Sequence, residues 1–156
     1  MSRSIYRFLL IPALLVLLAG CDRTQIRFNN RMVGTWNIAR EKIVIINQDG
    51  SVDEVANRTD AGTIEFFQEE FDRFFMQYNI TLNYDPFTWR EKPVKTDEQN
   101  KRMLFYYFYC EEQFECDMIA TIETNESDRQ IWSFYRSVSN NGQAAHRKTT
   151  WTLVAM

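Results

Sequence analysis

Hydrophobic and polar residues alternate along much of the chain beyond residue 33, which is the pattern of β-strands with one buried face. The clearest run extends over eleven residues, and every second position is apolar or aromatic: Phe74, Met76, Tyr78, Ile80, Leu82 and Tyr84. Apolar residues just upstream also fit a helical spacing. We therefore expect a helical turn near residues 68–72 and a strand from Arg73 onward.

Other segments carry the same signal. Strands are expected at 33–38, 43–46, 51–56, 63–66, 103–110, 117–123, 130–137 and 146–154. Asp49-Gly50 between two apolar stretches predicts a hairpin, and Asp60-Ala61-Gly62 predicts a second turn. Residues 85–101 contain two prolines and many charges, so we expect mostly loop there, with a short strand at Phe87 and Trp89.

The count of eight or nine short strands without a long helix predicts an all-β fold. Short connections favour an antiparallel meander, and closure removes the exposed edges of such a sheet. We therefore expect a small barrel of about eight strands.

The N-terminal segment has a different pattern. Arg3 and Arg7 precede an uninterrupted apolar run from Phe8 to Ala19. Twelve helical residues span about 18 Å, which is too short for a hydrocarbon core of about 30 Å. A basic start followed by a short apolar core is typical of a secretory signal.

The end of that signal, Leu18-Ala19-Gly20-Cys21, resembles the lipobox of bacterial lipoproteins. The resemblance implies cleavage before Cys21 and acylation of that residue by lipid chains such as palmitate. Residues 1–20 are then a signal peptide, 21–31 a lipidated tether, and 32–156 the folded domain. It also implies a bacterial envelope protein held on a membrane outside the cytoplasm, with inner and outer membranes both open. The alternative is an ordinary signal peptide with an unrelated cysteine.

Charge bears on the partners of the mature chain. The 156 residues have a net charge of −3, and removing residues 1–20 takes away two arginines and no acid, giving −5. A mildly acidic body is poorly suited to nucleic acid. We expect no nucleic-acid partner, and membrane contact through the lipid alone.

Two cysteines remain once Cys21 is assigned to the lipid. Cys110 and Cys116 are separated by five residues, and an oxidising compartment favours a disulfide between them. The alternative is a metal site of the two thiolates with Glu111, Glu112, Glu115 and Asp117. Thiolate sites commonly use four well-placed ligands and the single His146 is distant, so we favour the disulfide and expect no metal.

Gly34-Thr35-Trp36 opens the first strand and is similar to the G-x-W motif of lipocalins. The later Asp-Gly turn, residues 62–66 and the closing Thr-Trp-Thr-Leu strand resemble bacterial lipocalin-like lipoproteins. The resemblance covers roughly 33–156 and implies a lipocalin-like barrel. It also implies that Trp36 packs under an arginine from a late strand, for which Arg136 and Arg147 are candidates. The alternative is that Trp36 is simply a large core residue.

Residues suited to catalysis are scarce. His146 is the only histidine and lies beside Arg147 and Lys148, next to a predicted turn, so a hydrolase triad is not indicated. The acidic pairs lie in predicted turns, where charges are ordinarily solvated. We expect no enzyme activity and no cofactor.

Aromatic residues, 15% of the chain, are the one compositional excess. They suggest a non-enzymatic module that binds a small apolar ligand inside the barrel. Its expected lining is Trp36, Phe74, Met76, Tyr78, Tyr106, Phe108, Trp132 and Trp151. The alternative is a filled barrel that docks another envelope component through an outward row of aromatic residues.

Overall fold

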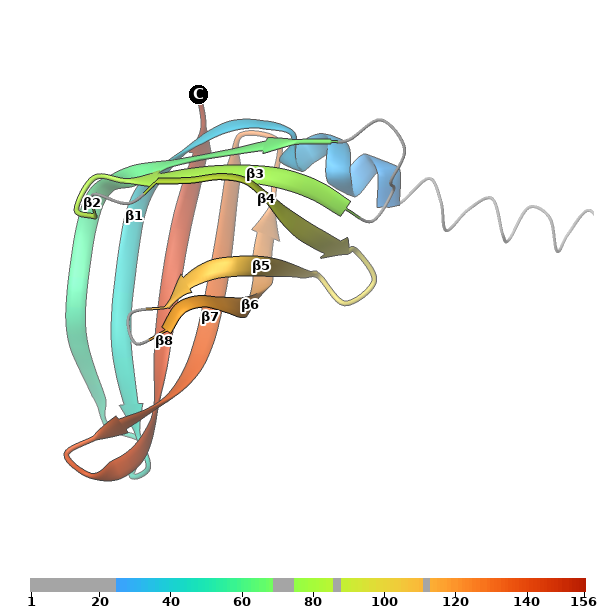
Figure 1. Cartoon of the computed structure of the whole chain (residues 1–156). Coiled ribbons are helices and arrows are strands. Elements are labelled where there is room, and N and C mark those ends of the chain that lie inside the picture. The colour runs from blue at the N-terminus through green and yellow to red at the C-terminus, as the bar shows by residue number, and fades with distance from the viewer. Residues whose placement is uncertain (1–24, 69–74, 86–87, 111–112) are drawn as a thin grey trace, which may run out of the picture.

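The computed structural model describes residues 25–68, 75–85, 88–110 and 113–156, with the backbone alone at 107–110 and 113–116. Eight consecutive antiparallel strands form one closed barrel (Figure 1). The strands are β1 (Gly34–Asn47), β2 (Val52–Phe67), β3 (Phe75–Leu82), β4 (Thr88–Asp97), β5 (Arg102–Cys110), β6 (Gln113–Asn125), β7 (Arg129–Asn140) and β8 (Gln143–Ala155). The meander and its closure confirm the predicted fold class, an all-β antiparallel barrel of eight strands.

Closure depends on β1, which pairs with β2 on one side and with β8 on the other. The Asn47–Ser51 hairpin that joins β1 to β2 confirms the Asp-Gly turn. Positive φ at Gly50, +84°, explains why glycine suits that turn. Alternation directs Met76, Tyr78, Ile80 and Leu82 of β3 into the core, as the sequence predicts.

The barrel is asymmetric along its axis because the strands pair over different lengths. β7 and β8 pair along their whole length, from Arg129↔Val154 to Asn140↔Gln143. In contrast, β3 pairs with β2 only over Gly62–Phe67, so the described structure shows no strand beside the Val52–Thr59 half of β2 on that side. β1, β2, β7 and β8 therefore extend toward one end, at the bottom of Figure 1, which we call the open end.

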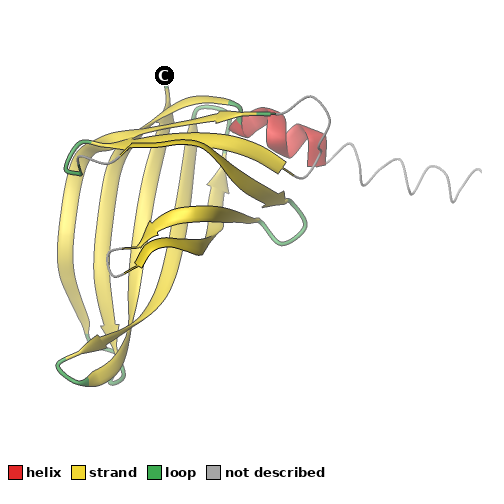
Figure 2. Ribbon diagram, in the orientation of Figure 1, coloured by secondary structure: helices red, strands yellow, loops and turns green. Residues whose placement is uncertain are grey.

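A helix lies at the opposite, closed end, where the sequence analysis predicted a tether. Residues 25–32 are helical (Figure 2). Phe28 and Met32 are buried against the barrel core. The tether prediction is therefore wrong for residues 25–31. The segment is mostly polar in sequence, but packing of its few apolar side chains against the barrel stabilises the helix.

The helix is also held by a buried polar network. Gln25 donates through Nε2 to Thr96 Oγ1 at 2.8 Å and to Asn29 Oδ1 at 3.0 Å, and Thr96 donates to Asn29 Oδ1 at 2.7 Å. The backbone N–H of Glu98 donates to Gln25 Oε1 at 3.1 Å. These bonds fasten the helix to the end of β4.

The predicted turn at Asp60–Gly62 is wrong: these residues lie within β2 as a β-bulge. The pairing with β1 shifts between Ile38↔Gly62 and Arg40↔Thr59. Asp60 has a φ of +50° and Gly62 of +152°. A Cβ on Gly62 would lie 2.1 Å from the carbonyl oxygen of Thr81, so only glycine allows β2 and β3 to approach here.

The predicted loop at 85–101 is also wrong over most of its length, because Thr88–Asp97 forms β4. Trp89, Val94 and Thr96 are buried, and this burial outweighs the charge and proline content. Pro93 pairs with Gln77 of β3, whereas the pairing of β4 with β5 begins only at Val94. Proline is tolerated where a strand lacks a neighbour on one side. The helical turn predicted near 68–72 falls almost wholly outside the described residues.

Candidate ligand-binding site

Aromatic rings fill the half of the barrel next to the helix, which we call the closed half. Phe66, Phe105 and Trp132 are almost fully buried, and their ring centroids lie 5.5 to 6.2 Å apart. Tyr78 packs edge-on against Phe105 at 5.0 Å and donates its hydroxyl to the Tyr106 carbonyl at 3.2 Å. Tilted and edge-to-face contacts at these distances are favourable. This half is a packed core.

Two of the buried tryptophans, Trp36 and Trp132, donate hydrogen bonds to partners near the helix. Trp36 donates through Nε1 to the Met32 carbonyl at 2.8 Å. Trp132 donates to Gln130 Oε1 at 2.8 Å, and Gln130 in turn donates to the Arg31 carbonyl at 3.3 Å. The closed end is therefore bonded as well as packed.

A row of side chains across five strands marks the boundary of this core. The strand register aligns the inward-facing residues Arg58, Glu41, Trp151, Trp132 and Ile122. Glu41 is only 2% exposed. Sequence reasoning did not identify this buried carboxylate.

Glu41 is compensated by three donors. Its Oε1 accepts hydrogen bonds from Tyr84 Oη at 2.8 Å and from Trp151 Nε1 at 3.0 Å, and its Oε2 accepts from the Arg58 guanidinium. Arg58 also lies 4.1 Å from the centroid of the Tyr84 ring. A buried carboxylate is tolerated when it is paired and hydrogen-bonded in this way.

Tyr84 serves this cluster as a permanent donor. Burial raises the pKa of its phenol well above the usual value, and the adjacent Glu41 carboxylate raises it further. The hydroxyl therefore keeps its proton throughout the neutral range. Tyr84 and Arg58 together connect the barrel interior to the surface at the β3–β4 turn.

The inward-facing side chains become smaller beyond this row. The next aligned row toward the open end is Ala56, Ile43, Thr149, Phe134 and Ala120. Compared with the preceding row, alanine replaces arginine on β2, threonine replaces tryptophan on β8, and alanine replaces isoleucine on β6. Ala56 and Thr149 are only half-buried. Less side-chain volume therefore projects inward at Ala56 and Thr149, whereas Ile43, Phe134 and Ala120 of the same row are buried.

The following row is charged. Arg136 of β7 lies directly opposite Arg147 of β8, and Arg147 lies opposite Ile45 of β1. Arg136 and Arg147 are half-buried; their strand neighbours Tyr135, Ser137 and His146 are exposed, and Lys148 is half-buried. Arg147 lies an even number of residues from the buried Ala145 and Trp151, and it pairs with Arg136, so both arginines belong to the inner face.

The predicted packing of Trp36 under Arg136 or Arg147 is therefore wrong. Trp36 pairs with Ala155, and Arg147 pairs with Ile45, nine positions further along β1. At about 3.3 Å per residue the two levels are separated by roughly 30 Å. Trp36 belongs to the packed core at the closed end. The arginines belong to the part of the barrel between the Glu41 row and the open end, which we call the open half.

The predicted ligand-lining residues divide into three groups. Trp36, Met76, Tyr78, Trp132 and Trp151 are buried in the core. Tyr106 lies on the outer face, half-buried and stacked on Phe75 with centroids 6.3 Å apart, so the structure does not place it inside the barrel. Phe74 and the side chain of Phe108 lie outside the described part of the chain.

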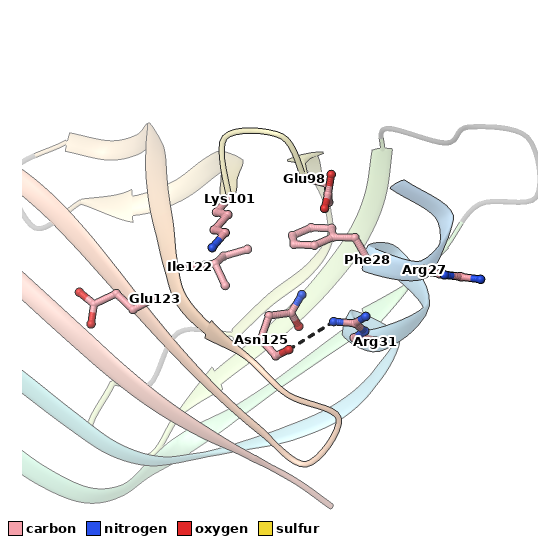
Figure 3. A pocket seen from close by; sticks show the side chains of 8 residues that line it. All are labelled: Arg27, Phe28, Arg31, Glu98, Lys101, Ile122, Glu123 and Asn125. Atoms are coloured by element: carbon pink, nitrogen blue, oxygen red, sulfur yellow. Dashed lines mark hydrogen bonds between the residues drawn. The ribbon is translucent and has the colours of Figure 1, made fainter. Parts of the chain in front are cut away.

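A concavity of about 330 Å³ lies at the closed end (Figure 3). Phe28 of the helix and Ile122 of β6 face one another across it, and Arg31 donates to the Asn125 carbonyl at 3.4 Å. Arg27 and Glu123 point away from it. The rest of its lining is Glu98, Lys101 and the Asn125 side chain, a mixed polar rim over a small apolar floor.

Two further hollows are polar. One of about 420 Å³ lies at the tip of the open end, among Asn47, Gln48, Asp49, Asp53, Asn140, Asn141 and Gln143. Another of about 340 Å³ lies on the outer face of β1–β4, among Thr35, Thr63, Glu65, Asn79, Thr81, Thr88, Arg90 and Glu91. Within the described residues, no group of three or more His, Cys, Asp and Glu side chains is placed to hold a metal ion.

The cysteines are only partly accounted for. Backbone pairing places Cys110 opposite Gln113 and Cys116 opposite Phe108, on the two arms of the β5–β6 hairpin. Their side chains, those of the alternative metal ligands Glu111, Glu112 and Glu115, and the whole of Cys21 lie outside the described part of the chain. The disulfide and the lipidation stay predictions. The one helix described is too short and too polar to span a membrane.

Comparison with known proteins gives a likeness of architecture. No known family profile matches the sequence, and no curated protein matches it. A redesigned β barrel is similar in structure, with 12% identity over 83% of this chain and 96% of that chain and a TM-score of 0.42. EF1p2_mFAP2b, solved bound to DFHBI, has 12% identity over 85% and 98% of the two chains and a TM-score of 0.42.

The S-type phycobiliprotein lyase CPES from Guillardia theta has 14% identity over 83% and 91% of the two chains and a TM-score of 0.39. At this level of similarity the likeness concerns the β-barrel architecture alone. We therefore derive a function from the residues of this chain.

Proposed function

We propose that this protein is a non-enzymatic binding module, held on a membrane of the bacterial envelope by lipid on Cys21, that takes a small, largely apolar molecule into the open half of its barrel. The observation that supports binding is the change in side-chain size along the inner face. The row next to Glu41 carries Ala56, Ile43, Thr149, Phe134 and Ala120, with a single ring, and the row after it carries Ile45 and two arginines.

The two halves of the barrel differ in the way that a binding site requires. An eight-stranded barrel is either filled by side chains or holds one small ligand, and ligand sites are mostly apolar and largely pre-formed. The ring cluster and the helix form a packed base. The Arg58–Glu41–Tyr84 contacts then hold the boundary row in place, since both carboxylate oxygens of Glu41 accept a hydrogen bond.

Binding is tested with a neutral apolar probe, N-phenyl-1-naphthylamine, and by native mass spectrometry of the purified full-length chain. Probe fluorescence should rise and saturate with the wild-type protein, or a ligand mass soluble in organic solvent should leave on denaturation. Failure to bind the probe, together with a bare native mass, would contradict the proposal.

Adjacent alanines supply a matched pair of variants. Ala145 is buried on the inner face of β8, and Ala144 is exposed on the outer face. Ala145→Phe should abolish probe binding by filling the open half, and Ala144→Phe should leave it unchanged. If circular dichroism shows that Ala145→Phe does not fold, Ile45→Trp at a half-buried inner position provides the second test. Equal effects of inner and outer substitutions would place the probe elsewhere.

Anchoring is tested separately. Cys21→Ala should leave the protein without lipid and release it from the membrane fraction, because the acyl chains supply most of the membrane affinity. A variant that stays with the membrane would show that another contact holds it.

The alternative function, docking of another envelope component, is supported by the outward stack of Phe75 on Tyr106, with the Lys95 ammonium 6.0 Å from the Phe75 centroid. Both rings are half-buried, which limits the apolar surface they offer. Tyr106→Ser should leave probe binding intact under the main proposal. Loss of a co-purifying envelope protein in that variant would favour docking.

A further inference from the structure

The open half of the barrel carries a feature that an apolar ligand alone does not explain. Arg136 and Arg147 stand directly opposite one another on the inner face. Directly opposed side chains in an antiparallel pair have Cβ atoms about 5 Å apart, and like charges in that arrangement are destabilising. A binding site that handled only apolar groups would gain nothing from two inward guanidinium groups.

We propose that Arg136 and Arg147 bind the anionic head group of an amphipathic ligand whose apolar chain lies against the small side chains of the preceding row. This inference rests on the proposed binding function and names the chemical class of ligand. The shared chemistry is a carboxylate or a phosphate monoester on a hydrocarbon chain. Guanidinium groups suit both, because their planar array of donors matches two acceptor oxygens.

The order of residues along β8 supports this orientation. From the core outward, the inner face carries Trp151, Thr149, Arg147 and then Ala145. An apolar chain directed toward Trp151 would place its head at the level of Arg147. Asp53 pairs with Ile45 and so lies on the same row as the two arginines. Its side chain is exposed, so water and salt screen its charge from them.

The two arginines also make contacts within the chain. A guanidinium has five N–H donors, so a contact within the protein leaves others for a ligand. Half-burial strengthens such bonds relative to those on a fully exposed side chain. The pair is therefore able to serve both the barrel and a bound anion.

The inference is tested by comparing ligands of one chain length and different heads. Dodecanoate and dodecyl phosphate are titrated against dodecanol, with inorganic phosphate as the head without a chain, by isothermal calorimetry on the full-length protein. We expect at least one anionic ligand to bind about 10- to 100-fold more tightly than dodecanol, as expected for hydrogen bonds to a charged group. The anion that shows the preference identifies the head.

Variants assign the preference to the two arginines. Arg136→Gln and Arg147→Gln should each reduce the anion preference by about tenfold and leave dodecanol binding unchanged. Arg129→Gln, on the same strand but exposed at the closed end, is the matched control and should change neither. Arg147→Lys keeps the charge and should restore part of the preference.

Each outcome bears on one claim. Equal binding of anionic ligands and dodecanol by the wild type would overturn the inference while leaving the proposed binding function standing. Absence of binding by every ligand would overturn the inference, and it would overturn the proposed function as well if N-phenyl-1-naphthylamine also failed to bind. Loss of stability in the glutamine variants with an unchanged anion preference would show that the arginine pair only supports the barrel.

Discussion

The two ends of the barrel use the same strands for different purposes. At the closed end, inward positions carry large rings whose polar atoms are bonded to one another or to the helix, as Trp36 is to Met32 and Trp132 to Gln130. At the open end, the same inner face carries Phe134, smaller side chains and a pair of arginines, and Arg136, Arg147 and Thr149 are only half-buried. The large buried rings are therefore concentrated in one half, and the other half is the one that we propose for binding.

The row containing Glu41 separates these regions. Its carboxylate accepts bonds from β8 and from the β3–β4 turn, and its partner Arg58 belongs to β2. Polar groups at this position tie strands together without adding apolar volume. On β6 and β7 the packed core extends one row further, to Ala120 and Phe134, whose ring centroid lies 4.8 Å from that of Trp151.

The largest expected effect compares one residue from each half. Trp132→Ala removes a fully buried ring and should reduce the free energy of unfolding by about 3–5 kcal/mol. Ile45→Ala, at a half-buried inner position of the open half, should cost about 1 kcal/mol, since less area is lost from the core. Urea denaturation of both variants measures the contrast. Equal losses would mean that the halves share one core.

A smaller effect is expected from the network that fastens the helix. Asn29→Ala leaves buried groups of Gln25 and Thr96 without one acceptor and should cost about 1–3 kcal/mol. Asn30→Ala, the exposed neighbour on the same helix, is the control and should be near neutral. Hydrogen exchange of the helix amides should accelerate only in the Asn29 variant. Similar behaviour of the two would show that the network does not hold the helix.

The boundary row should respond next. Arg58→Ala removes one of three donors to Glu41 and should cost about 1–2 kcal/mol, less than a fully buried pair because 38% of the Arg58 side chain is exposed. Arg40→Ala, an exposed arginine on β1 bonded to Asn57, should cost little. Chemical denaturation at neutral pH compares the two. An unchanged free energy of unfolding in Arg58→Ala would mean that the hydrogen bonds from Tyr84 and Trp151 are enough to compensate the buried Glu41 carboxylate.

The smallest effect concerns pH and the outer face. The Ser133 hydroxyl donates to Glu123 at 2.5 Å and, with the Lys148 ammonium at 3.1 Å, holds the pKa of Glu123 below its usual value. This group therefore adds stability above about pH 5 that is lost as the pH falls through its lowered pKa. Ser133→Ala should lower the free energy of unfolding more at pH 7 than at pH 3, because protonation of Glu123 in acid removes the bond to its carboxylate from the wild type as well. Urea denaturation at the two pH values measures this difference. A loss that is constant from pH 7 to 3 would exclude the linkage.

Some features of the open half follow from the sequence once the bulge is known. Trp36 and Ile38 are apolar at even positions of β1, whereas Ile43 and Ile45 are apolar at odd positions. That change of parity signals an inserted residue between them, and the bulge at Ile38/Arg40 is the structural counterpart. Its consequence is that Glu41, and not Arg40, faces the interior. The sequence analysis predicted separate strands at 33–38 and 43–46, and therefore did not predict that Glu41 faces the interior.

Periodicity determined the strands, the barrel and much of the core, because alternating burial is a local property of a strand and its neighbours in sequence. Met76, Tyr78 and Ile80 on one face of β3 are the clearest case. The disposition of charges was decided by tertiary structure. Whether Arg136 and Arg147 lie over Trp36 or at the far end depends on the register of β8 against β1.

The helix at the closed end was likewise decided by tertiary contacts. Residues 25–32 form a segment too short to be helical alone, and their helix exists because the barrel end accepts Phe28 and Met32 and supplies Thr96 as a polar partner. The sequence by itself therefore determined an all-β chain with an aromatic core. The closed barrel decided which end is sealed, and which residues face the space that remains, because both depend on strand register and on contacts between residues far apart in the chain.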